Sequence, residues 1–292
     1  MSEKKKLWCV RLLTAIMLIG LLTGCGSPSP AASQATETAA PAAQAADGFS
    51  VKLLSTGKSD CAIIYMDGLV IVNDTADADD ADAIASALKA DGVSRIDYMI
   101  LSHYDKDHIG SAAALLEGFA VGTVLRQAHT EESAEYEALV AAEKKRGVPV
   151  VILKEDYTIE TANGFVTVDP PNTDYGDDNN NSAVTTVSYR EHRLLFLGDA
   201  KKKRIEEYLD TAQGGCDFVK LPHHGDWNKA LESLLRRSAP RWAAATVLSS
   251  EDVAPELAAQ LKELGAALLC TSDGTVRIQW NGEALAVEQL SK

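Results

Sequence analysis

Histidine is scarce in this chain, and four of its six copies fall in two short segments that are suited to binding metal. The first segment, 102–110, reads SHYDKDHIG, so His103, Asp105, Asp107 and His108 stand within six residues of one another. Imidazoles and carboxylates are common ligands of divalent cations in proteins. Directly after an apolar strand, two histidines and two acids would leave charge uncompensated unless a cation or a partner is present. The spacing therefore favours a metal site.

Two further polar segments follow predicted strands. Gly198-Asp199 comes after an apolar run at 193–197, and His223-His224-Gly225 comes after another at 218–221. In α/β proteins functional groups collect in the loops at strand ends. We therefore expect these segments to join the first one in a single site.

The elements that must position these groups alternate between short apolar strands and helical patterns. Helices are expected at 81–89, 111–116, 131–146, 202–209, 228–236 and 254–264. Strands are expected at 51–55, 62–65, 69–72, 98–101, 121–126, 150–153, 165–168, 183–189, 193–197, 218–221, 242–246, 267–269, 276–280 and 284–287, with Glu191-His192 as a hairpin turn. Helices flanking two sheets predict an α/β (α+β) fold, arranged as a four-layer αββα sandwich.

The pattern His103-x-Asp105-x-Asp107-His108 resembles the H-x-[HD]-x-D-H metal motif of the metallo-β-lactamase fold. The Gly198-Asp199 and His-His-Gly segments agree with that family in order and spacing. More narrowly, segments 57–60, 179–182, 223–225 and 271–275 resemble the extracellular hydrolase domain of ComEC-type competence proteins. Teichoic acid phosphorylcholine esterases are similar in overall pattern. The resemblance implies a metallo-β-lactamase sandwich and a hydrolase.

The resemblance also implies a ligand set for one or two divalent ions, Zn or Mn. The first site would take His103, Asp105 and Asp199, and the second would take Asp107, His108, Asp199 and His223. Asp105 stands where the family more often has histidine, and no histidine lies between Leu153 and Ser182, so Asn180 is the candidate to supply an amide oxygen. Asp107 would also orient the attacking water. His224 would donate to the leaving group or serve as a supporting residue.

The first 47 residues are typical of an exported and tethered protein. Lys4 to Lys6 precede an apolar run at 12–22, which predicts a signal peptide at 1–24. The box Leu22-Thr23-Gly24-Cys25 resembles the bacterial lipobox, so Cys25 would be lipidated and anchor the chain to the outer face of the cell membrane. Residues 25–47 are rich in Ser, Pro and Ala and predict a flexible tether. The hydrolase domain is expected at 48–292.

Charge bears on the partners of the protein. The chain carries a net charge of −14, and residues 1–24 carry a net +3, so the exported part carries −17. Such a surface disfavours binding along nucleic acid by counterion release. A basic run, Lys201 to Arg204, follows Asp199 and either meets an anionic substrate or covers the outside of a helix. We expect a monomer.

Two histidines and one acidic run lie outside the motifs. His129 either lines the pocket or lies exposed on the following helix, and His192 is expected on the surface in the hairpin turn. The acidic run at 77–82 lacks the glycine and final glutamate of an EF-hand loop, so we interpret it as a solvated helix start.

Three functions remain open from the sequence. The first is a lipid-anchored, metal-dependent hydrolase of a small or polymeric phosphoester. The second is a competence-type extracellular nuclease that acts on DNA, and the third is a non-catalytic lipoprotein with a vestigial metal site. A β-lactam or thioester substrate is also compatible with the fold, because a fold does not fix a function.

Overall fold

A computed structural model of the protein describes residues 48–212 and 214–291. The expected signal peptide, the tether and the lipidated Cys25 lie outside these residues. Within the described ranges no helix is long and apolar enough to cross a membrane.

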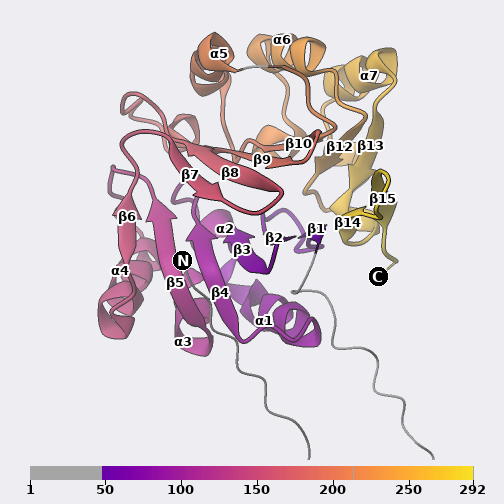
Figure 1. The fold of residues 1–292 in the computed structure, drawn as a ribbon. Helices are drawn as coiled ribbons and strands as arrows, with labels where there is room; N and C mark the ends of the chain where they lie inside the picture. Colours follow the sequence, from indigo (N-terminus) through magenta and orange to yellow (C-terminus); the bar gives the residue numbers. More distant parts are fainter. Residues whose placement is uncertain (1–47, 213, 292) are drawn as a thin grey trace, which may run out of the picture. The chain divides into compact units, whose positions relative to one another are not determined.

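Two sheets form the centre of the domain (Figure 1). The first sheet has eight strands, in the spatial order β15 (Leu285–Gln289), β14 (Val276–Trp280), β1 (Phe49–Leu53), β2 (Ala62–Met66), β3 (Leu69–Asn73), β4 (Arg95–Ile100), β5 (Ala120–Arg126) and β6 (Val150–Ile152). The second has seven, in the order β13 (Ala267–Cys270), β12 (Trp242–Ala245), β11 (Phe218–Lys220), β10 (His192–Phe196), β9 (Val184–Tyr189), β8 (Gly164–Asp169) and β7 (Tyr157–Glu160).

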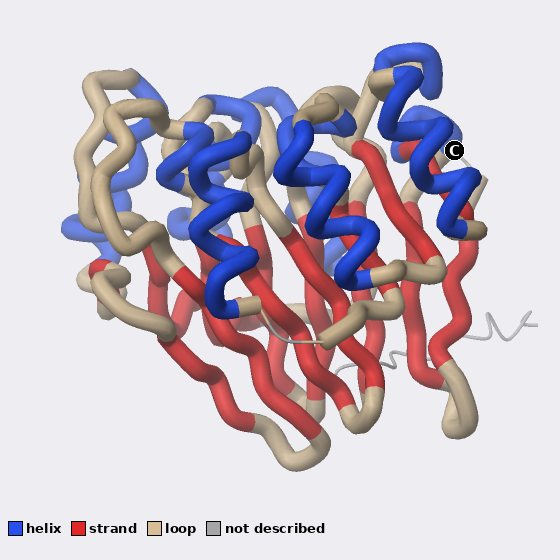
Figure 2. The backbone as a smooth tube through the Cα atoms, turned by 90° about the horizontal axis from the view of Figure 1, so that it is seen from above, coloured by secondary structure: helices blue, strands red, loops and turns tan. Residues whose placement is uncertain are grey.

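Helices cover the outer face of each sheet, as Figures 1 and 2 show. The helices on the first sheet are α1 (Ala81–Ala90), α3 (Ala112–Gly118) and α4 (Ala134–Arg146). Those on the second are α5 (Lys202–Thr211), α6 (Lys229–Ser238) and α7 (Pro255–Leu264). A one-turn helix, α2 (Lys106–Ile109), lies in the first metal-motif segment. The expected four-layer αββα sandwich is therefore confirmed.

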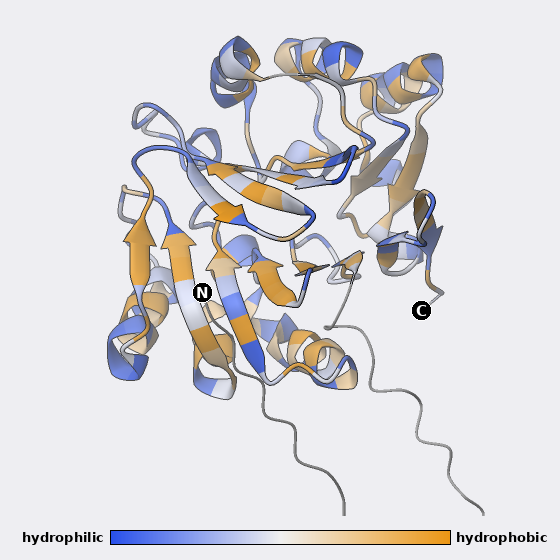
Figure 3. Ribbon diagram, viewed as in Figure 1, coloured by the Kyte–Doolittle hydropathy of each residue, from blue (hydrophilic) through white to orange (hydrophobic). Residues whose placement is uncertain are grey.

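Three apolar cores hold the four layers together. The middle core joins the two sheets, with Val51 and Ile64 from the first packed in one cluster with Val187 and Phe196 from the second. The outer cores lie between each sheet and its helices. Figure 3 shows the strands largely apolar and much of the helical surface hydrophilic. Burial on both faces explains why many of the strands read as short continuous apolar runs.

Parallel pairing brings the polar loops to the ends of the sheets. Strands β3, β4 and β5 pair in parallel, and so do β10, β11, β12 and β13. The loops that carry the three polar segments all follow the carboxyl ends of these strands, where α/β folds position functional groups.

The boundaries differ from expectation at identifiable places. Helix α4 begins at Ala134 rather than 131, because the Ser133 side chain accepts a hydrogen bond from the Tyr136 backbone N–H and caps the helix there. Strand β7 was not predicted, since only one of its four residues, Ile159, is buried.

The expectation for His192 was wrong. The turn lies at 190–191, and His192 begins β10 with its side chain only 12% exposed. The imidazole lies 5.2 Å from the Trp280 ring, and its Nδ1 is 3.2 Å from Asp217 Oδ2.

Candidate metal centre

The first metal-motif segment follows β4 and includes the one-turn helix α2. His103 and His108 are fully buried, and their ring centroids are 4.0 Å apart. The carbonyl of His108 accepts hydrogen bonds from the backbone N–H and the hydroxyl of Thr75, in the loop after β3. The neighbouring strand end therefore holds the one-turn helix in place.

Four side chains from both sheets form the first group of ligands. His108 Nε2 lies 3.2 Å from Asp199 Oδ1, and His224 Nε2 lies 3.2 Å from Asp199 Oδ2. His224 Nε2 is also 3.1 Å from Asp107 Oδ2. Asp199 thus lies between two imidazoles, and Asp107, with a side chain 25% exposed, is the member of the group most open to solvent. Two imidazoles and two carboxylates form a donor set that suits a divalent cation.

A second group comprises His103, Asp105 and Asp178, whose ligand atoms lie within 4.8 Å of one another. His103 Nε2 is 3.5 Å from Asp105 Oδ2. Because the rings of His103 and His108 are neighbours, the two groups lie side by side.

Hydrogen bonds from the other ring nitrogen orient each imidazole of the two groups. His108 Nδ1 is 3.0 Å from Asp74 Oδ2, and His224 Nδ1 is 2.9 Å from the hydroxyl of Thr246. His103 Nδ1 is 3.0 Å from the hydroxyl of Ser102, which donates to Asp74. Such partners fix the ring orientation and leave Nε2 for a metal.

Two of these Nε2 atoms have no hydrogen-bond partner. Within the described ranges, the Nε2 atoms of His103 and His108 are buried and unpaired. A buried polar atom without a partner costs about 1–3 kcal/mol. A bound cation would satisfy both atoms, so the residues present fit a metal.

The charges of the first group reinforce this conclusion. Burial alone would lower the pKa of His108, but the carboxylates of Asp199 and Asp74 hold it well above its usual value. Burial would raise the pKa of Asp199, but His108 and His224 hold it well below its usual value. The site therefore attracts positive charge, which a divalent cation supplies.

A buried lysine lies next to the carboxylate of Asp199 in the first group. Lys220, at the end of β11, contacts Asp60 Oδ2 and lies 3.8 Å from Asp199 Oδ1. Its Nζ also donates to the carbonyl of Gly198 at 3.2 Å. Burial lowers the pKa of Lys220, while the adjacent carboxylates favour its charged form.

The backbone conformation at two points is specific to this site. Gly198 has φ +52°, and a Cβ there would lie 2.8 Å from the Ser102 side chain, so only glycine fits before Asp199. His223 and His224 both have positive φ, which is uncommon outside glycine and is found at functional sites.

Comparison with known proteins identifies the family. The family model described as the metallo-β-lactamase superfamily matches residues 55–241. The chain belongs to this superfamily. Among solved structures, the metallo-β-lactamase fold protein YhfI from Bacillus subtilis has a TM-score of 0.53 and 11% identity, and the match covers 79% of this chain and 100% of that one. That likeness shows the fold alone.

Curated relatives carry competence names, in line with the ComEC-type resemblance. ComE operon protein 3 of Bacillus subtilis is 25% identical over 158 residues, which are 53% of this chain and 20% of that protein. Competence protein ComA of Neisseria gonorrhoeae is 28% identical over 232 residues, which are 77% of this chain and 29% of that protein. The chain therefore spans less than a third of either relative.

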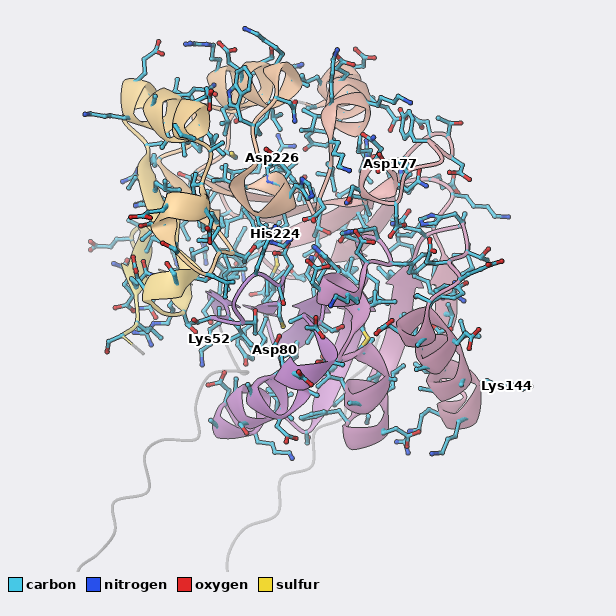
Figure 4. All side chains as sticks on the ribbon, turned by 180° about the vertical axis from the view of Figure 1, so that it is seen from behind. Lys52, Asp80, Lys144, Asp177, His224 and Asp226 are labelled. Carbon is cyan, nitrogen blue, oxygen red and sulfur yellow. The ribbon has the colours of Figure 1, made fainter. Side chains whose placement is uncertain are left out.

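The metallo-β-lactamase centre brings together five of the six expected ligands. His103, Asp105, Asp107, His108 and Asp199 all lie in the two groups. At the sixth position the candidate group contains His224 rather than the expected His223. The left-handed turn after Pro222 directs His224 inward, whereas the His223 side chain is 32% exposed and lies 3.3 Å from Asp226 Oδ2. In Figure 4 His224 lies toward the middle of the domain, with Asp226 nearby.

The amide oxygen of Asn180 contacts the backbone of the following helix. Its Oδ1 accepts a hydrogen bond from the backbone N–H of Arg204 at 3.3 Å, in the first turn of α5. The side chain therefore joins the loop to the helix start.

The basic run after Asp199 does not form one patch. Arg204 is fully buried and donates to the carbonyl of Ser182 at 2.9 Å and to Asp169 Oδ1 at 2.6 Å. Lys202 and Lys203 are exposed, and Lys201 lies 3.6 Å from Asp177. Only the three lysines remain available to an anionic substrate.

Sequence reasoning assigned no role to five residues that the structure places in or behind the centre: Asp60, Asp74, Asp178, Lys220 and Thr246. Lys220 carried a usable signal, because it is the one charge in the apolar run 218–221. Asp178 carried none, since acids and asparagines fill the whole segment 177–181.

Proposed function

We propose that the protein is an exported, lipid-anchored, metal-dependent hydrolase of phosphoesters. One observation carries the proposal. The imidazoles of His103, His108 and His224 are buried, and the Nδ1 atom of each lies within hydrogen-bond distance of a side-chain oxygen, while its Nε2 atom faces carboxylates. Structural histidines have no need of such a shared orientation, whereas metal ligands do.

The metal would be held by the two ligand groups. When bound, divalent metal supplies a water of lowered pKa and polarises a phosphoryl oxygen. Asp107, the most exposed carboxylate of its group, is placed to accept a hydrogen bond from an attacking water. His223 replaces His224 as the candidate proton donor to the leaving group, because it is partly exposed and its backbone N–H lies 3.2 Å from Asp199 Oδ1.

Two features support a small phosphoester as the substrate. The exported part, with its net charge of −17, repels a polyanion such as DNA. An open pocket of about 340 Å³ is lined in part by Gln127, His129 and Lys154, and His129 also contacts Asp178 of the second ligand group. That volume suits a small molecule.

Export and anchoring rest on the N-terminal residues. A signal peptide at 1–24, the lipobox-like segment that ends at Cys25 and the tether at 25–47 together support a lipoprotein on the outer face of the membrane.

A nuclease is the second candidate, because the curated relatives carry the names of competence proteins. The two functions differ in their dependence on salt. A nuclease built to hold DNA loses affinity as salt rises, because counterion release weakens its binding. An acidic enzyme that repels DNA gains affinity for it as salt rises, because salt screens the repulsion; the screening length is roughly 8 Å at 0.15 M.

The test is an assay of the full-length protein, with Mn²⁺ or Zn²⁺, against a small phosphodiester, a phosphorylcholine ester, duplex DNA and nitrocefin. We expect kcat/KM for a small phosphoester to exceed that for DNA by at least about tenfold, and DNA cleavage to rise between about 20 and 200 mM salt. Efficient DNA cleavage that falls steeply with salt would establish the nuclease instead. A protein that binds metal and turns over none of the four would refute the hydrolase proposal as stated.

A further inference from the structure

We propose that Asp178 is a metal ligand that completes a second cation site with His103 and Asp105, and that His129 is its positioning residue. The inference deepens the proposed metal-dependent function and rests on it. It replaces the amide oxygen of Asn180 with a carboxylate two residues earlier in the same loop.

The first argument is the unpaired nitrogen of His103. The side chain is fully buried, its Nδ1 is occupied by the Ser102 hydroxyl, and its Nε2 has no hydrogen-bond partner in the described part of the chain. That Nε2 atom belongs to the group whose ligand atoms, together with those of Asp105 and Asp178, lie within 4.8 Å of one another. The orphaned nitrogen therefore faces two carboxylates.

The second argument is the charge of the two carboxylates. Across the described ranges, the basic groups within salt-bridge distance of them are imidazoles alone, His103 for Asp105 and His129 for Asp178. Asp105 Oδ2 also accepts a hydrogen bond from the Asn179 amide at 3.1 Å. Two carboxylates at such close range, with side chains 46% and 13% exposed, repel each other unless a cation lies between them. Lys201 lies 3.6 Å from the neighbouring Asp177 instead.

The third argument is the way in which Asp178 is held. Its Oδ2 accepts a hydrogen bond from the backbone N–H of Tyr104 at 2.8 Å, and Tyr104 stands between His103 and Asp105 in the sequence. The loop before β9 is thereby joined directly to the segment that carries the other two ligands.

His129 completes this arrangement. Its Nε2 contacts Asp178 Oδ1, and its ring lies 4.7 Å from the ring of Tyr104. The Tyr104 hydroxyl in turn donates to the carbonyl of Gln127 at 2.6 Å. A ligating carboxylate needs such a partner to hold its orientation, and removing the partner costs about 10- to 100-fold in metal affinity.

The donor set indicates the metal. The second group offers one imidazole and two carboxylates, whereas the first offers two of each. Carboxylates favour Mn²⁺, and imidazoles favour Zn²⁺. The site that contains Asp178 is therefore the one suited to Mn²⁺.

The experiment measures metal stoichiometry rather than activity. The full-length protein is stripped with chelator, titrated with Mn²⁺ and followed by isothermal calorimetry and by the EPR signal of free Mn²⁺. We expect two Mn²⁺ per chain for the wild type and one for Asp178→Asn. Asp177→Asn is the matched control, because it removes the same charge from the same loop, and it should keep two.

A second variant tests the positioning residue. His129→Phe keeps an aromatic ring beside Tyr104 and loses the contact with Asp178. It should retain two sites and weaken one of them by about 10- to 100-fold. Circular dichroism of each variant reports on its folding.

The outcomes separate this inference from the proposed function. Two Mn²⁺ sites of unchanged affinity in Asp178→Asn would overturn the inference and leave the hydrolase proposal standing. If Asp178→Asn loses the second site and the wild type shows no phosphoesterase activity, the result would support the inference and refute the proposed substrate class. A wild type that binds no metal would overturn both.

Discussion

Replacing Lys220 with methionine tests a buried charge behind the centre. The Lys220 side chain is 2% exposed, contacts Asp60 and lies 3.8 Å from Asp199. Methionine fills a similar volume but leaves both carboxylates buried without their cation. Removing one partner of a buried ion pair costs about 3–5 kcal/mol.

That cost can be expressed as a melting temperature. For a domain of 150–250 residues, 1 kcal/mol shifts Tm by roughly 2–4 °C, so Lys220→Met should lower Tm by about 6–20 °C. The lower part of this range is favoured, because Asp60 Oδ1 keeps a hydrogen bond from the Thr246 hydroxyl at 2.5 Å.

The assay is thermal unfolding of the full-length protein in chelator, which removes stabilisation by bound metal. Lys144→Met is the matched control, because Lys144 is exposed on α4, at the edge of the view in Figure 4, and should change stability by less than about 0.5 kcal/mol. The double variant Lys220→Met/Asp60→Asn should recover part of the loss. A Tm for Lys220→Met within about 2 °C of the wild type would refute the buried ion pair.

Three further substitutions have defined outcomes. Asp199→Asn should abolish hydrolysis and reduce metal content, since a neutral amide between His108 and His224 binds cations poorly; full activity would remove Asp199 from the centre. Arg204→Met should lower the free energy of unfolding by about 3–5 kcal/mol in chemical denaturation, because it leaves the Asp169 carboxylate without its buried partner; an unchanged midpoint would contradict this. Cys25→Ser should release the protein from the membrane fraction or leave it unprocessed, because stable anchoring needs more than one acyl chain; unchanged fractionation would contradict the lipobox interpretation.

Much of the fold was predictable from the sequence because many buried strands are apolar runs and most outer helices have one apolar face. Strand β2 is buried at all five positions and was found within one residue of its bounds. Strand β7, with only Ile159 buried, lacks that pattern. Hydrophobic periodicity reports burial, so an edge strand with little burial escapes it.

The site was predictable where ligands stand close together in the sequence. His103 to His108 lie in one loop, and their spacing alone indicated a metal site. The choice between His223 and His224 was not predictable, because it depends on the left-handed backbone of the turn after Pro222. Asp178 was not predictable either, since its role depends on Tyr104 and His129, which lie 74 and 49 residues away.

The orientation of His192 shows the same limit. A histidine beside a hairpin turn reads as exposed, yet Trp280 from the other sheet covers it. Contacts between elements that are distant in sequence leave no local pattern.

The most direct test of the central claim measures metal content and phosphoesterase activity in the same samples. The full-length protein is stripped with chelator and then titrated with Mn²⁺ or Zn²⁺, while bound metal and hydrolysis of a small phosphodiester are followed together. The stripped protein should be inactive, and activity should return in proportion to metal bound. Full activity in the stripped protein, or bound metal that never restores hydrolysis of any phosphoester, would contradict the account.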